Sequence, residues 1–136
     1  MSENERIVRA FFEAFNADDI ETALTIFDDT VVLEMSGLPE QEETQPFWGH
    51  DGARELWRLN REPFDEVIVE ILDVIEKGDD VVVLTHNHAR GRASGIAVMQ
   101  PRGAVVTVLG GKIVRARFYT DHARAIEEAG LGSDAT

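Results

Sequence analysis

Residues 81–120 read VVVLTHNHARGRASGIAVMQPRGAVVTVLGGKIVRARFYT. Runs of β-branched and apolar residues are separated by turn-forming clusters at 93–95 and at Gly110-Gly111, which predicts antiparallel strands over 81–92, 96–109 and 112–120. Pro101-Arg102-Gly103 lies inside the middle strand, where proline cannot donate to the ladder and glycine permits a bulge. The stretch therefore predicts three antiparallel strands, with a kink in the middle one.

The residues before this stretch predict mainly helices. Ser2 can cap a helix over about 3–16, in which five apolar residues recur at helical spacing. Asp18 or Asp19 can cap a second short helix, with Ile20, Leu24 and Phe27 on its inner face. The other predicted elements are a strand over 30–35, a loop over 37–48, a helix over about 49–61, a strand over 64–76, a turn over 77–80 and a final helix over 122–129, capped by Asp121.

Composition limits the class of protein. The chain has 136 residues, with 13 Lys and Arg against 26 Asp and Glu, so its formal net charge is −13. This length predicts a single domain over residues 1–136, and the absence of cysteine excludes disulfides, thiolate metal sites and cysteine nucleophiles. The acidic balance argues against nucleic-acid binding, and no apolar run approaches the roughly 20 residues of a membrane span. Because the N-terminus is acidic and polar, unlike a secretory signal, we expect a cytoplasmic protein without a nucleic-acid or membrane partner.

The charges are unevenly distributed. Residues 81–120 contain no Asp or Glu, so all 26 acidic residues lie elsewhere in the chain. One interpretation is a basic surface that attracts an anionic ligand. The other is that these bases pair with acids on neighbouring strands, such as Glu66 and Glu70. The bases concerned are Arg90, Arg92, Arg102, Lys112, Arg115 and Arg117.

Five short segments, taken in order, carry a family resemblance. They are FFEAFNADDI (11–20), LTIFDD (24–29), WGHDG (48–52), GGKI (110–113) and RFYTD (117–121). In their order and spacing they resemble the SnoaL-like and ketosteroid-isomerase-like branch of the nuclear transport factor 2-like superfamily, over roughly residues 4–131.

The resemblance implies an α+β fold in which a cone-shaped, curved antiparallel sheet wraps around the N-terminal helix and encloses an apolar cavity. It also implies a homodimer formed through the sheet. Alternation along the strand 81–92 separates Thr85 and Asn87 from His86 and His88, and the resemblance places the first pair inside. In the last strand, the row with Phe118 is the apolar one. The residues we expect to contact a ligand are Phe11, Phe15, Met35, Trp48, Trp57, Asn87 and Phe118. For the apolar ones, core packing is the other interpretation, and Trp48 is either a lid residue or a plug.

The catalytic residues of the best-known enzymes with this resemblance are replaced in this sequence. Ketosteroid isomerases use a carboxylate base with a tyrosine and a protonated aspartic acid as oxyanion donors. The matching positions here are Phe11, Met35 and the vicinity of Gly103 and Ala104, none of which can do this work. The Asp-Arg-Asp set of limonene-epoxide hydrolases is likewise replaced, by Asn87, Ala89 and Phe118.

Three residues remain as catalytic candidates. SnoaL-like cyclases use a pocket aspartate with His and Asn helpers, and His86, His88 and Asp121 are the residues of that kind near Asn87. His86 and His88 point the same way, at a spacing that can hold a metal, but no third ligand is evident, so we predict no metal. A position on the sheet surface or at a dimer interface is the other interpretation of the pair, and an N-cap is that of Asp121.

Two functional hypotheses follow. The chain either acts on a small hydrophobic or aromatic molecule as a cofactor-independent isomerase or cyclase, or binds such a molecule without turnover, as a ligand-binding or dimeric accessory domain. No cofactor motif, such as a glycine-rich dinucleotide fingerprint or a P-loop, occurs in the sequence.

Overall fold

The computed structural model describes residues 1–36 and 45–131. Within these residues no helix is long and apolar enough to span a membrane. The elements are α1 (Glu3–Asn16), α2 (Ile20–Ile26), β1 (Phe27–Met35), β2 (Gln45–Trp48), α3 (Gly49–Arg61), β3 (Phe64–Lys77), β4 (Asp80–Gly91), β5 (Ala97–Leu109), β6 (Lys112–Tyr119) and α4 (His122–Glu128).

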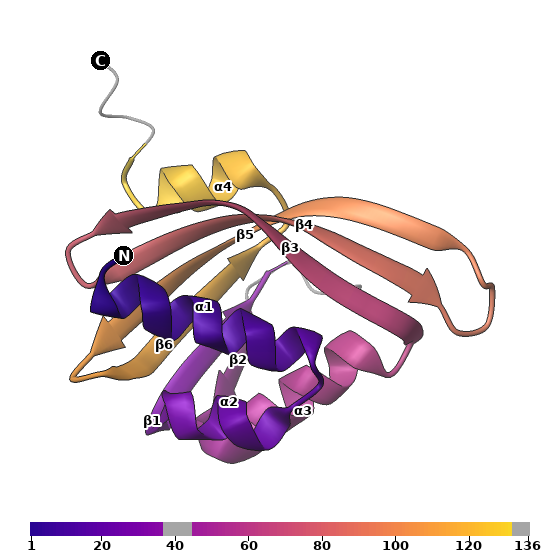
Figure 1. Ribbon diagram of the computed structural model, residues 1–136, viewed down its shortest axis with the longest axis horizontal. Coiled ribbons are helices and arrows are strands. Elements are labelled where there is room, and N and C mark those ends of the chain that lie inside the picture. The colour runs from indigo at the N-terminus through magenta and orange to yellow at the C-terminus, as the bar shows by residue number, and fades with distance from the viewer. Residues whose placement is uncertain (37–44, 132–136) are drawn as a thin grey trace.

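The strands form one curved sheet in the order β2-β1-β6-β5-β4-β3. Strand β1 pairs with β6 in parallel, and the other neighbours are antiparallel. Helices α1, α2 and α3 lie on one side of the sheet and α4 lies on the other (Figure 1). This confirms the predicted α+β class, with a curved but unclosed sheet around the N-terminal helix.

The predicted caps and the tight hairpin are confirmed. The Ser2 side chain accepts a hydrogen bond from the Glu5 N–H at 3.0 Å, and Asp19, not Asp18, caps α2 by accepting from Thr22. Asp121 caps α4. Between β5 and β6, Gly110 and Gly111 have φ values of 58° and 79°, which the two central residues of a type I′ turn require.

Three predictions about strands need correction. The segment 45–48, expected to be loop, forms the edge strand β2, with Phe47 opposite Leu33 of β1; residues 37–44 of that loop lie outside the described residues. Strand β1 begins at Phe27, which was expected on the second helix. The kink expected at 101–103 includes no bulge against β4, although glycine permits one, because β4 and β5 stay in register there. The pairing of β5 with β6 ends at Gly103 and Tyr119, so Pro101 lies outside it. Its missing N–H therefore interrupts no hydrogen bonds between β5 and β6.

Both faces of the sheet centre are buried. The main core lies between the sheet and α1, α2 and α3, and includes Val8, Phe11 and Val106. A smaller cluster under α4 contains Tyr119 and Ala125. The apolar row of β6, which includes Phe118, therefore faces the main core, as expected. The other row, which includes Tyr119, is partly covered by α4.

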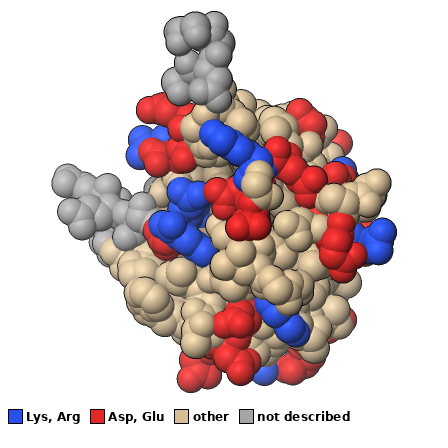
Figure 2. Space-filling view, turned by 90° about the vertical axis from the view of Figure 1, so that its left-hand side faces the viewer, with Lys and Arg blue, Asp and Glu red and all other residues tan. Residues whose placement is uncertain are grey.

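Figure 2 shows Lys and Arg side chains beside Asp and Glu side chains on one face of the molecule. Basic residues of the strand region are paired in this way. This confirms pairing, because four of the six predicted bases have a carboxylate within 4.0 Å. The pairs are Arg90–Glu66 (3.8 Å), Arg92–Asp65 (3.3 Å), Arg115–Glu34 (2.6 Å) and Arg117–Asp80 (3.7 Å).

Candidate functional site

A cavity of about 420 Å³ lies between the concave face of the sheet and helices α1 and α3. Its volume falls within the range of small-molecule sites, roughly 300–1,000 Å³. Aromatic and aliphatic side chains dominate its wall. Those from the helices include Phe11, Phe15, Leu56 and Trp57, and those from the strands include Phe27, Leu33, Met35, Val69 and Phe118.

The aromatic wall is held by contacts from the turn between α1 and α2. The rings of Phe15 and Trp57 meet edge to face, with centroids 5.0 Å apart. The Trp57 indole N–H donates to the Asp18 carboxylate at 2.8 Å. The guanidinium of Arg61 lies over the Phe15 ring and pairs with Asp18 at 3.2 Å. Asp18 adopts φ 53°, a left-handed conformation that aspartate tolerates better than most residues. The turn therefore fixes the indole plane at the cavity wall.

Polar groups reach the cavity from β4 and β5. Thr85 is almost fully buried, and its hydroxyl donates to the side-chain oxygen of Asn87 at 2.8 Å. This bond orients the Asn87 amide, and within the described residues the two N–H donors of its NH2 group have no hydrogen-bond acceptor. Gln100 and Arg102 lie on β5, and Asn87 pairs with Gln100 across the strands. A ligand would therefore meet hydrogen-bonding groups mainly on the β4–β5 side.

Arg102 is the one charged side chain among the described residues that line the cavity. Its guanidinium donates to the carbonyl oxygens of Pro101 at 3.0 Å and Thr120 at 3.1 Å, both neutral acceptors. Burial lowers its pKa, but an arginine stays protonated at neutral pH. Within the described residues no carboxylate lies within ion-pair distance of Arg102, which therefore brings a positive charge without a carboxylate partner to a largely apolar cavity.

The lining within residues 1–36 and 45–131 holds no aspartate, glutamate or histidine. Tyr119 also borders this space, but it packs in the cluster under α4, on the other face of the sheet. Burial raises the pKa of its phenol, so it is neutral at neutral pH. The described wall can donate hydrogen bonds but carries no side chain suited to accept a proton.

The structure brings together six of the seven predicted ligand contacts. Trp48 does not join them, because it is 67% exposed and lies outside the lining. The six that line the cavity are Phe11, Phe15, Met35, Trp57, Asn87 and Phe118.

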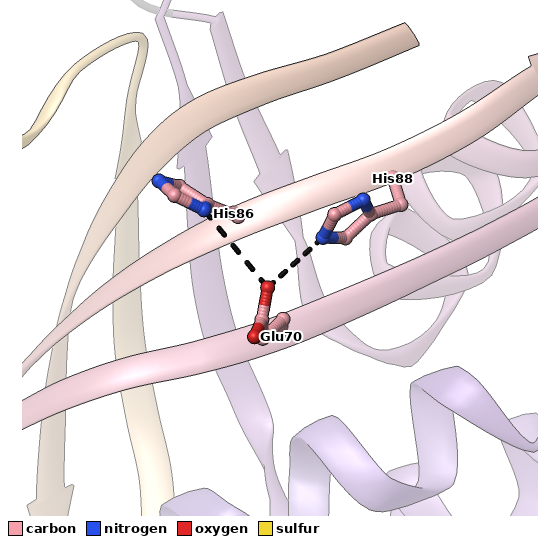
Figure 3. Close-up of side chains that lie close together, drawn as sticks. All are labelled: Glu70, His86 and His88. Atoms are coloured by element: carbon pink, nitrogen blue, oxygen red, sulfur yellow. Dashed lines mark hydrogen bonds and ion pairs between the residues drawn. The ribbon is translucent and has the colours of Figure 1, made fainter. Parts of the chain in front are cut away.

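The three catalytic candidates are not at the cavity. His86 and His88 project from the opposite face of β4, and Asp121 accepts the Arg124 N–H at 2.7 Å as the cap of α4. We therefore assign no catalytic role to these residues. His86 and His88 do meet a partner that the sequence analysis missed, since Glu70 of β3 points between them (Figure 3).

Other lining residues that the sequence analysis did not select could have been found from strand alternation. Val98, Gln100, Arg102 and Ala104 alternate along β5 and all face the cavity. Extending the inward row from Ala104 in steps of two identifies Arg102 and Gln100. The sequence analysis assigned inward rows only to the strands 81–92 and 112–120, so this row was not selected.

Comparisons with known proteins agree with this fold. The model of the SnoaL-like domain family matches residues 8–116, and the chain belongs to this family. A search of curated proteins found no match.

Solved structures share the fold. An NTF2-like protein of unknown function from Burkholderia pseudomallei is 23% identical, with a TM-score of 0.79, and the match covers 93% of this chain and 97% of that one. TerC, co-crystallized with polyporic acid, is 23% identical with a TM-score of 0.76 and the same coverage, 93% and 97%. IdmH from Streptomyces antibioticus, proposed to be a polyketide cyclase, is 18% identical with a TM-score of 0.75, over 95% of this chain and 99% of that chain.

Proposed function

We propose that this protein binds a small aromatic or hydrophobic molecule with an acidic oxygen in the cavity between α1, α3 and the sheet. The observation that carries the proposal is the pairing of an aromatic wall with Arg102, the single described charge in the lining. Rings would stack near Phe15 and Trp57, and the anionic oxygen would pair with the guanidinium. The co-crystals of TerC with polyporic acid support an organic acid as a ligand class for this fold.

A pair of fluorescent probes separates the apolar and the charged parts of this proposal. 1-Anilinonaphthalene-8-sulfonate and the uncharged N-phenyl-1-naphthylamine share their rings and differ by the sulfonate. We expect both probes to bind, and Arg102→Gln to weaken binding of the anionic probe by at least about tenfold while leaving the neutral one nearly unchanged, since a charged hydrogen bond contributes about 1.5–3 kcal/mol. Arg90→Gln, which removes an exposed arginine outside the lining, is the matched control.

Filling the cavity tests whether the probes enter it. Ala89 lines the cavity and is half-buried, so Ala89→Trp should place an indole in the space and abolish binding of both probes. Ala97→Trp makes the same substitution at an exposed position of β5 outside this lining and should leave binding unchanged. Equal binding by both variants would show that the probes lie elsewhere and would refute the proposal.

Turnover is the second candidate, as a cofactor-independent isomerase or cyclase. IdmH and other neighbours described as polyketide cyclases support it. Arg102 and the Asn87 amide could stabilise a developing enolate oxygen, but the described lining provides no base to form it. Binding without turnover is therefore placed first. Deuterium exchange next to the carbonyl of 2-tetralone in D2O separates the two: acceleration by the protein that is lost in Arg102→Gln would favour catalysis.

The homodimer that the resemblance implies stays a prediction, as does the cytoplasmic location. Arg115 and Arg117, on the row of β6 that faces away from the cavity, already pair with Glu34 and Asp80 of the same chain. Sedimentation velocity of the wild type would test the dimer.

A further inference from the structure

We propose that Glu70, His86 and His88 form a binding site for a divalent transition-metal ion on the outer face of the sheet. The three side chains come from neighbouring strands: Glu70 of β3 is paired with His86 of β4, and His88 follows two residues later on the same face. Each turns a ligand atom toward the same point, as Figure 3 shows.

The distances suit a metal with little rearrangement. The Glu70 Oε1 atom lies 3.0 Å from His88 Nε2 and 3.9 Å from His86 Nδ1, and the three ligand atoms are all within 4.8 Å of one another. In a tetrahedral site with metal–ligand bonds of about 2.0–2.2 Å, neighbouring ligand atoms lie about 3.3 Å apart. The observed separations lie on either side of that value, so small side-chain rotations suffice.

The environment leaves a coordination position open. The side chains of Glu70, His86 and His88 are 53%, 33% and 48% exposed, so solvent reaches the centre of the cluster. Water can therefore complete the coordination, as in zinc sites with three protein ligands. Two imidazoles and one carboxylate favour ions such as Zn²⁺, Ni²⁺ or Cu²⁺ over Mg²⁺, which prefers oxygen ligands.

His86 is also supported from behind. The His122 ring stacks on it, with centroids 5.9 Å apart and planes 12° from parallel. His122 Nε2 lies 2.8 Å from the carbonyl oxygen of Thr85, which anchors that ring to β4. The stack restricts the His86 ring and lowers the entropic cost of ordering it around an ion.

The site is independent of the cavity, because none of its three residues lines that space. A metal there would link β3, an edge of the sheet, to β4. The ion would stabilise the sheet edge or present a metal-bound water at the surface. Testing for the ion requires no assay of the cavity.

Calorimetric titration with ZnCl2 on the metal-stripped protein tests the proposal. We expect one Zn²⁺ per chain, no measurable binding of Mg²⁺, and at least a tenfold loss of Zn²⁺ affinity in each of Glu70→Gln, His86→Ala and His88→Ala. His50→Ala is the matched control, since His50 lies on α3, outside the cluster, and the affinity should not change. Circular dichroism of each variant checks that the fold is kept.

Three results would overturn the proposal. The first is the absence of saturable Zn²⁺ binding to the wild type. The second is Zn²⁺ binding that survives all three substitutions, and the third is an equal loss of binding in His50→Ala; either would mean that the ion binds at other surface groups.

Discussion

Asn16, the last residue of α1, joins the helix to the free edge of the sheet. Strand β3 is at the end of the strand order, so one side of its backbone has no neighbouring strand. The Asn16 amide uses that side: its Nδ2 donates to the Val69 carbonyl at 2.9 Å and its oxygen accepts the Val69 N–H at 2.8 Å. One side chain thus takes the place of a strand at this point and holds α1 over the concave face.

The substitution Asn16→Ala removes both hydrogen bonds and leaves two polar backbone groups of a buried residue without them. Each of the two buried groups left without a partner costs about 1–3 kcal/mol, so we expect a loss of about 2–6 kcal/mol. An unfolding entropy of about 2.1 cal/mol/K per residue over 136 residues converts this loss to a fall in Tm of about 7–21 °C.

Thermal melts followed by circular dichroism measure this effect. Asn60→Ala is the control, because among residues 1–36 and 45–131 the Asn60 amide donates to one acceptor, the Leu56 carbonyl, one turn earlier in its own helix. Its Tm should stay within about 2 °C of wild type, since the better helix propensity of alanine offsets the lost bond. An Asn16→Ala variant that melts within about 2 °C of wild type would refute the reasoning that this amide closes the edge of β3.

Three further predictions concern the cavity and its surroundings. Tyr119 is the chain's only tyrosine, so its titration can be followed alone by absorbance at 295 nm. Because burial raises the pKa of Tyr119, the titration midpoint should lie above about 10. The stability that the neutral phenol contributes should be present below about pH 10 and be lost as pH rises through the folded-state pKa. A midpoint at or below 10 would contradict this. Gly103→Ala would push a methyl group into Ala125 of α4 and should cost about 1–3 kcal/mol in urea unfolding, with part of the loss recovered in the double variant with Ala125→Gly. No recovery would show that the two sites do not compete for space. Phe15→Ala should cost less than the about 3–5 kcal/mol typical of a solid core, because one side of the ring already borders the cavity, and a loss in that full range would argue against an open space there.

Local patterns in the sequence were enough for the helices, the caps and most of the strands. Ser2, Asp19 and Asp121 cap helices through backbone groups within three residues of themselves, so the short-range signal sufficed. The short edge strand β2 was missed because its four residues show no periodicity and depend on β1 for hydrogen bonds.

The cavity wall was predictable where a residue's face followed from alternation and from the family resemblance. Phe11, Phe15 and Phe118 are large apolar residues on the inner rows, and they line the cavity. Trp48 was predicted to contact a ligand, but it lies outside the lining. It precedes α3 and pairs with Val32 of β1, and periodicity does not encode this pairing.

Alternation along the chain determined which residues share a face, because a strand's period is a property of its own backbone. Which of those residues meet across strands was decided only by tertiary structure. The register between β3 and β4 places Glu70 against His86, and helix packing carries Asn16 to Val69, 53 positions away along the chain. The unbroken register of β5 with β4 around residues 101–103 turns Arg102 into the cavity. These contacts depend on long-range pairing, in which a shift of one residue would exchange the faces, and no local pattern fixes such a shift.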